Sequence, residues 1–216
     1  MAFSAKVEAL FKTHPMTLID FAVDDLKVNP TTMKKLAASI KDGTIGIEIK
    51  DTGSKLSAAY SRKRIILRKE SEADYPEGRA AIVHEGVHAW ADLSRFTSGV
   101  LDECAGYLTE VVYLMHLKRK ISGHPIYDAA NALAASKKLG SKKGQKLTRA
   151  DCQPLSDAIK ADSAYQGLSE QASLGRPARA SRGLTSSTRF LASGPARDED
   201  SCHRILMNEL ESPVVT

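Results

Sequence analysis

The chain has 216 residues and a formal net charge of +5, with 42% hydrophobic, 26% charged and 6% aromatic residues. This length accommodates one domain with a tail or two small domains, and the hydrophobic content suffices for a packed core. The low aromatic content argues against a nucleic-acid binder that stacks bases on aromatic side chains, and no apolar run approaches the roughly 20 residues that span a bilayer. We therefore expect a soluble, mildly basic protein with neither a transmembrane segment nor specific nucleic-acid binding.

The cysteines and the N-terminus indicate the cellular compartment in which the protein is made. Cys104, Cys152 and Cys202 lie far apart and form no C-x-x-C pair, a usage that indicates a reducing compartment or no redox role. Residues 1–6 lack the long apolar stretch of a cleaved signal peptide. We therefore expect synthesis in the cytoplasm, which is compatible with later export by a route that needs no cleaved signal.

The first part of the chain mixes helical and extended patterns. Residues 2–12 predict a short amphipathic helix that ends at His14, and residues 17–23 are apolar and β-branched enough for a strand. A second helix is expected over residues 31–41. In residues 45–49, isoleucines alternate with glycine and glutamate, which indicates a half-buried strand.

Another strand is expected over residues 62–69, after a turn at residues 51–54. Basic side chains flank the apolar centre of this strand. Natural sheets protect exposed edges with charge, so we expect residues 65–68 to form the open edge of a small sheet. Edge protection explains these charges better than a preference for an acidic partner does.

The sharpest feature of the sequence is His84-Glu85-Gly86-Val87-His88, inside a predicted helix at residues 79–93. Residues four apart lie on one helical face, so both imidazoles would point to one place, with Glu85 about 100° further round the helix. The rest of the helix is almost entirely apolar and therefore buried, and buried polar groups need a partner. A metal ion supplies one, since this pattern matches two zinc-bound histidines with a glutamate as general base. The alternative is an amphipathic helix with two histidines at its polar edge.

A catalytic zinc usually has a third protein ligand, and the helix predicted at residues 100–115 offers one. Together with the H-E-x-x-H pattern, Glu103-Cys104-Ala105-Gly106 resembles the gluzincin metallopeptidases, in which a glutamate on a second helix completes the site. The resemblance covers roughly residues 55–117. It implies Zn²⁺ held by His84, His88 and Glu103, with Glu85 as the catalytic base.

Asp102 is an alternative to Glu103 as the third ligand. Glu103 follows His88 by fifteen positions, a shorter spacing than in the best-known gluzincins. Asp102, in Gly99-Val100-Leu101-Asp102, loosely resembles the aspzincin arrangement, and helical geometry places both carboxylates beside the apolar face. Glu110 is a further carboxylate, expected behind the ligands or in solvent.

A peptidase also needs a donor to the negatively charged oxygen of the transition state. Tyr107 is the preferred candidate because it lies one helical turn from Glu103. Tyr60, His116 and His124 are the other candidates.

The gluzincin resemblance implies an α+β, zincin-like fold, with a small antiparallel or mixed sheet packed on the H-E-x-x-H helix and the ligand helix behind it. We expect this domain to span residues 1–140. Residues 141–166 are expected to form a basic linker and a helix interrupted at Pro154, and residues 167–216 a flexible tail with a possible short terminal helix.

The function that follows from this resemblance is zinc-dependent hydrolysis of a peptide bond in a protein substrate. Small size, no signal peptide and a basic tail are also similar to bacterial metallopeptidase effectors, which are toxins delivered into other cells. The alternative is a non-enzymatic protein in which zinc staples two helices and the surface binds a partner.

Overall fold

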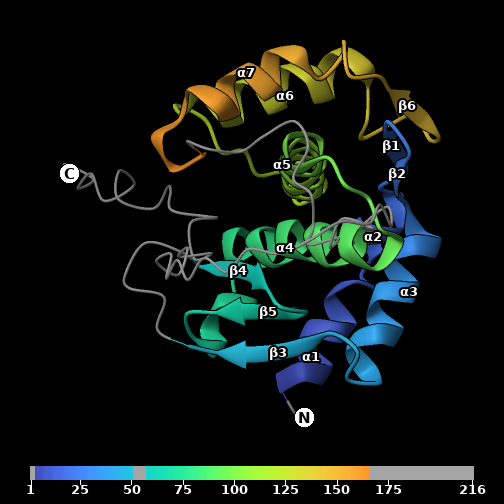
Figure 1. The fold of residues 1–216 in the computed structure, drawn as a ribbon, viewed down its shortest axis with the longest axis vertical. Coiled ribbons are helices and arrows are strands. Elements are labelled where there is room, and N and C mark those ends of the chain that lie inside the picture. The colour runs from blue at the N-terminus through green and yellow to red at the C-terminus, as the bar shows by residue number, and fades with distance from the viewer. Residues whose placement is uncertain (1–2, 51–56, 166–216) are drawn as a thin grey trace, which may run out of the picture.

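The computed structural model describes residues 3–50 and 57–165, which form a mixed α/β fold of the α+β type with two small sheets (Figure 1). Its elements are α1 (Phe3–Leu10), α2 (His14–Leu18), β1 (Phe21–Val23), β2 (Leu26–Val28), α3 (Pro30–Lys41), β3 (Gly46–Ile49), β4 (Ala58–Ser61), β5 (Arg64–Leu67), η1 (Glu70–Ala73), α4 (Pro76–Ser94), α5 (Gly99–His116), α6 (Pro125–Lys137), β6 (Gln145–Leu147), α7 (Gln153–Ala161) and η2 (Ser163–Tyr165).

One sheet joins distant parts of the chain in the order β2-β1-β6. β1 pairs antiparallel with β2 and parallel with β6, so that Phe21 lies opposite Gln145. The strand expected at residues 17–23 is shorter than predicted, and His14 begins helix α2 instead of ending the preceding helix. The physical reason is that Pro15 falls in the first turn of α2, where a missing N–H costs no hydrogen bond.

The other sheet has the order β3-β5-β4, with β5 parallel to β3 and antiparallel to β4. The prediction that residues 65–68 form the open edge is therefore wrong, because β5 is the central strand. The chain reverses at Arg62 and Lys63, which both have positive φ (50° and 61°), as a two-residue hairpin turn requires. Within the described residues β3 and β4 are the two edge strands, and β4 packs along α4.

Helices α4 and α5 form the centre of the fold and pack side by side (Figure 1). Figure 1 shows the β3-β5-β4 sheet on one side of α4, with α5 on the other side. Pro76 opens α4 at a position that suits proline, and Arg95 ends it with a left-handed backbone. Just before α4, Glu72 is fully buried and accepts hydrogen bonds from Arg68 and Tyr75, which fixes the entry to the helix.

Residues 125–165 cover the far side of α5 with α6, β6, α7 and η2 (Figure 1). They share the main hydrophobic core, to which the residues beyond 140 contribute Leu147, Cys152, Leu155, Ile159 and Tyr165. Pro154 lies in the first turn of α7, so it begins this helix and does not interrupt it. The expected tail at residues 167–216 lies outside the described residues. Among the described residues, no helix is both long enough and apolar enough to cross a membrane.

Candidate metal centre

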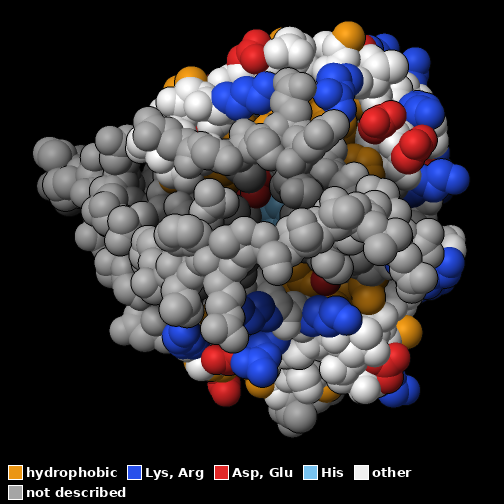
Figure 2. All heavy atoms as spheres, in the orientation of Figure 1, with side chains coloured by type: hydrophobic (Ala, Val, Ile, Leu, Met, Phe, Trp, Pro, Cys, Tyr) orange, Lys and Arg blue, Asp and Glu red, His pale blue; other side chains and the backbone are white. Residues whose placement is uncertain are grey.

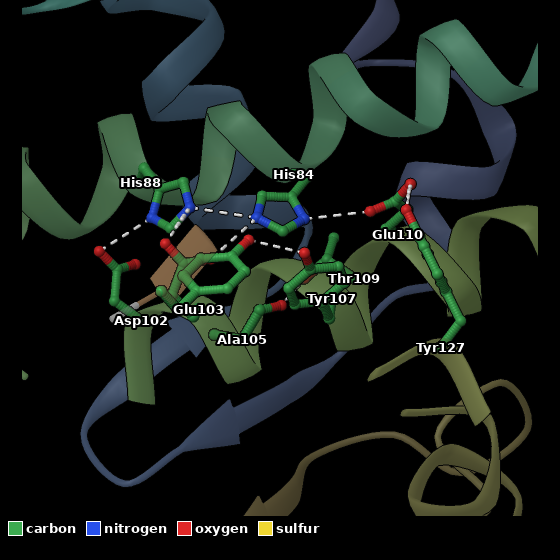
Figure 3. Close-up of polar contacts among 10 residues, drawn as sticks. His84, His88, Asp102, Glu103, Ala105, Tyr107, Thr109, Glu110 and Tyr127 are labelled. Atoms are coloured by element: carbon green, nitrogen blue, oxygen red, sulfur yellow. Dashed lines mark hydrogen bonds and ion pairs between the residues drawn. The ribbon is translucent and has the colours of Figure 1, made fainter. Parts of the chain in front are cut away.

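His84, Glu85 and His88 lie on α4, and all three are buried, with exposed fractions of 3%, 3% and 7%. The two histidines face carboxylates of α5. Their one-turn spacing brings His84 Nε2 within 3.1 Å of His88 Nε2. Figure 3 shows the two imidazoles side by side, directed at the carboxylates of α5. Residues 84 and 88 thus lie on one helix, as the sequence predicts, and their four-residue spacing brings the two imidazoles together.

Glu103 on α5 completes the group. One of its carboxylate oxygens lies 3.5 Å from His84 Nε2, and the other lies 3.5 Å from His88 Nε2. The three side chains each offer one ligand atom, all within 4.8 Å of one another, so this buried His84–His88–Glu103 group could hold a metal ion. Of the two carboxylates that the sequence left open, Glu103 is the one inside the group.

Gly106 lets the two helices approach at this point. A Cβ atom at Gly106 would lie 2.7 Å from His84 Nε2, a distance that real Cβ atoms essentially never show. Glycine is therefore required on α5 one turn after Glu103, because the His84 ring occupies the space of a side chain.

Asp102 meets His88 from the opposite side of the ring. Its Oδ2 lies 2.9 Å from His88 Nδ1, and its side chain retains 22% exposure (Figure 3). A hydrogen bond at Nδ1 fixes the orientation of a histidine and leaves Nε2 for a metal. The two neighbouring carboxylates thus contact different atoms: Glu103 lies at Nε2 of both histidines, and Asp102 lies at Nδ1 of His88.

Glu110 and Tyr127 form the equivalent support for His84. Glu110 Oε2 lies 3.0 Å from His84 Nδ1, and the Tyr127 hydroxyl on α6 donates to Glu110 Oε1 at 2.8 Å. Of the two positions expected for Glu110, behind the candidate ligands or in solvent, the structure has the buried one behind His84 (Figure 3). Sequence reasoning missed Tyr127, because nothing in the α6 pattern distinguishes it from an ordinary core tyrosine.

The electrostatics of the group favour positive charge between the carboxylates. Burial lowers the pKa of His84, but hydrogen bonds to Glu103 and Glu110 outweigh burial and raise this pKa to about 9. Burial likewise lowers the pKa of His88, and the charges of Asp102 and Glu103 raise it well above its ordinary value. A metal ion would replace these protons, since imidazole binds metal in its neutral form.

Tyr107 lies next to the group. Its ring packs edge-on against His84, with ring centroids 4.6 Å apart, and its hydroxyl lies 2.6 Å from the hydroxyl of Tyr165. Both tyrosines are 4% exposed. Burial first, and then the charge of Glu103, raises the pKa of each hydroxyl well above its ordinary value. Sequence reasoning missed Tyr165, which is 58 positions away.

The other candidate donors have different partners. Tyr60 on β4 donates to Asp92 Oδ2 at 2.7 Å, which ties the edge strand to α4. His124 accepts from the Ile126 N–H at the start of α6 and lies 3.4 Å from Asp162. His116 lies at the last position of α5. His116 and His124 are thus not part of the His84–His88–Glu103 group.

The face that carries the group has a mixed charge. Figure 2 shows histidine and acidic side chains near the centre of this face, with lysine and arginine side chains around them. In comparisons with known proteins, no family model, no curated protein and no solved structure matches this chain.

Proposed function

We propose that the protein is a zinc-dependent peptidase of the zincin group, similar to gluzincins, that hydrolyses a peptide bond of a protein substrate. The observation that carries the proposal is the convergence of His84 Nε2, His88 Nε2 and the Glu103 carboxylate in a buried site, with the buried Glu85 next to His84 along α4. Three protein ligands are the set typical of a catalytic zinc, whose fourth position is left for water or substrate.

The donor distances fit zinc. Two atoms about 2.1 Å from a tetrahedral ion are about 3.4 Å apart. The two Nε2 atoms are 3.1 Å apart, and each lies 3.5 Å from one oxygen of Glu103, His84 from Oε2 and His88 from Oε1. Two imidazoles and one carboxylate are also a donor set found in zinc peptidases. When bound, zinc supplies Lewis acidity, which lowers the pKa of a coordinated water to about 7 and polarises a carbonyl.

The residues of the chain would perform three tasks. His84, His88 and Glu103 hold the ion, and Asp102 and Glu110 orient the two imidazoles. Glu85 accepts a proton from the attacking water and can pass it to the departing amine. Burial of Glu85 beside the ligands excludes bulk water from this transfer.

The edge strand β4 offers a docking place for an extended substrate. Arg68 N donates to Ser57 O at 3.2 Å, so that pair is hydrogen-bonded in the β4–β5 hairpin. Hydrogen-bonded pairs alternate along an antiparallel ladder, so Ala58 and Tyr60 direct their backbone groups to the outer edge. β4 itself carries no charged side chain that would block strand addition.

The alternative function is a structural zinc site without catalysis. The position of the group favours this alternative, because the group lies between α4 and α5, which pack closely together. An ion bound there would hold the two helices together. In that case Glu85 has no proton to accept, and the surface of the protein would bind a partner.

Metal analysis and one substitution decide between these functions. We expect one zinc per chain in protein never exposed to chelator, both in wild type and in Glu85→Gln. Glutamine keeps the size of Glu85 but cannot accept a proton, so Glu85→Gln should lower proteolysis by at least roughly 10²-fold. Because effector-like peptidases act in other cells, new peptide termini should be mapped in bacterial and eukaryotic hosts that express each form.

Absence of zinc from the wild type would refute the metal site. Identical terminus profiles for two folded, zinc-loaded proteins would favour the structural staple. A wild-type profile with new termini that Glu85→Gln lacks supports the peptidase.

A further inference from the structure

Two buried thiols lie against each other between the ligand helix α5 and helix α7. Cys104 is on α5, and Cys152 is the residue at which α7 is capped. Both are free cysteines with an exposed fraction of 0%. They are 48 positions apart in the sequence, so no local spacing pairs them. The packing of α7 against α5 brings them together.

The two thiols share a hydrogen bond. Hydrogen bonding with the Cys152 thiol is the largest of the effects that raise the pKa of Cys104, and burial comes next. The same hydrogen bond lowers the pKa of Cys152, against the opposing effect of burial. The Cys104 S–H therefore donates and the Cys152 sulfur accepts. Two sulfur atoms in this contact are neighbours, which is what a disulfide between them requires.

The start of α7 is fixed in the position that maintains this contact. Lys137, at the end of α6, donates to Asp151 Oδ1 at 2.6 Å. The Thr148 N–H donates to Asp151 Oδ2 at 2.8 Å, and the Cys152 N–H donates to Thr148 O at 3.2 Å. This turn ties the backbone of Cys152 to α6, so the Cys152 sulfur stays beside α5.

We propose that Cys104 and Cys152 form a disulfide with an oxidant of the glutathione disulfide class, and that this bond fastens residues 145–165 onto the ligand helix. The Cys152 thiolate attacks one sulfur of glutathione disulfide, which breaks its S–S bond and releases one glutathione. Cys104 then loses its proton and attacks the Cys152 sulfur of the mixed disulfide, which releases the second glutathione. The protein loses two electrons and two protons, and the two glutathione molecules gain them.

Burial determines when this exchange happens. Glutathione reaches the two sulfur atoms while the chain folds or when α7 opens locally, and the finished bond is then shielded from reductants. The bond also restricts the unfolded chain, which should raise Tm by roughly 4–16 °C for a chain of this size. In the reduced protein, residues 145–165 depend on packing and hydrogen bonds alone.

The test equilibrates the full chain with about 1 mM each of reduced and oxidised glutathione, starting both from native reduced protein and from protein refolded in the same buffer. Disulfide should exceed dithiol by at least roughly tenfold, because the fold presents one thiol to the other at an effective concentration above the mM range of a flexible tether. After alkylation in denaturant, tryptic digestion places the three cysteines in separate peptides, residues 96–118, 150–160 and 198–204. Each possible pairing therefore has its own mass.

Cys202→Ala is the matched control, at a cysteine that lies outside the described residues. It should keep both the Cys104–Cys152 bond and the gain in Tm. Cys152→Ala should lose both. Wild type oxidised in concentrated urea should instead give a mixture of the three pairings, because the fold no longer selects one.

Other results would overturn the proposal. One is native protein that remains dithiol, and another is glutathione attached to one cysteine without a bond between the two. A bond that leaves Tm unchanged or lowers it would show that residues 145–165 are not fastened by it. Wild type and Cys202→Ala decide the matter by themselves if Cys152→Ala does not fold. The test involves neither metal nor substrate, so its result is separate from that of the proposed peptidase.

Discussion

Glu103 and Asp102 are neighbours on α5, yet their carboxylates meet the histidines at different atoms. Glu103 lies 3.5 Å from both Nε2 atoms, and Asp102 lies 2.9 Å from Nδ1 of His88. We expect Glu103→Ala to remove measurable zinc binding, because it deletes a ligand. Asp102→Ala should weaken zinc binding by only about 10–100-fold, the usual cost of a lost outer partner. Competition with a chromophoric chelator measures both values.

Asp102→Asn is the matched variant, because its amide oxygen can still accept from His88 Nδ1. It should retain more affinity than Asp102→Ala. The assignment of the two carboxylates would be reversed if Asp102→Ala lost all zinc while Glu103→Ala kept it.

The sequence could nominate these residues but could not choose between them. Both carboxylates flank the apolar face of a predicted helix about equally, and only the rotation of α5 against α4 decides which one reaches Nε2. The position of Tyr165 could not be predicted from the sequence, because its contact with Tyr107 depends on the path of α6, β6 and α7. Local spacing predicts pairs on one helix, and contacts between segments far apart in the chain depend on the whole fold.

At the scale of elements, the approach of α5 to α4 depends on Gly106. A glycine to alanine change inside a helix normally stabilises by about 0.5–1 kcal/mol. Here the added Cβ would lie 2.7 Å from His84 Nε2, so Gly106→Ala should instead lower the free energy of unfolding by about 1–3 kcal/mol, as overpacking does. Urea denaturation of the metal-free protein isolates this effect from zinc binding.

Gly140→Ala provides the comparison. A Cβ atom there would meet Met115 at 3.5 Å, an ordinary contact, so the free energy of unfolding should change little. A Gly106→Ala protein more stable than wild type would contradict the close packing of the two helices.

The elements differ in how well the sequence predicts them. The patterns for α4 and α5 came within three residues of the observed ends, since long apolar repeats are the strongest signal of secondary structure. The β4–β5 hairpin was missed because Arg62 and Lys63 are not the Asn or Gly residues that usually mark such turns. The strand expected at residues 62–69 contains β5 but not β4, and the missing partner strand also misplaced the edge of the sheet.

At the scale of the whole molecule, zinc removal should destabilise the fold. An ion that binds the native state at 1,000 times its dissociation constant adds about 4 kcal/mol to the free energy of unfolding. For a chain of this size that corresponds to roughly 8–16 °C in Tm. Calorimetry before and after chelation should show this decrease, and re-addition of zinc should reverse it.

His88→Ala serves as the control for this measurement. Without a ligand, its Tm should be nearly the same with and without chelator. A wild-type Tm that does not respond to chelation, in protein shown to contain zinc at the start, would contradict a buried site between the two central helices.

The pairing of β1 with β6 has a consequence for how the protein is made. A growing chain contains all three proposed ligands once residue 103 has been made. The strand β6, which pairs with β1, is complete only at residue 147, and Tyr165, which is hydrogen-bonded to Tyr107, is added later still. Contacts between such distant segments form late, because the loop between them must be closed first. We therefore expect an emerging chain to carry exposed histidines and carboxylates for about 3–12 seconds, at the roughly 5–20 residues per second of synthesis. The cell would meet this protein first as an unstructured metal-binding peptide, and the buried centre would form only after α7 and η2 had been made.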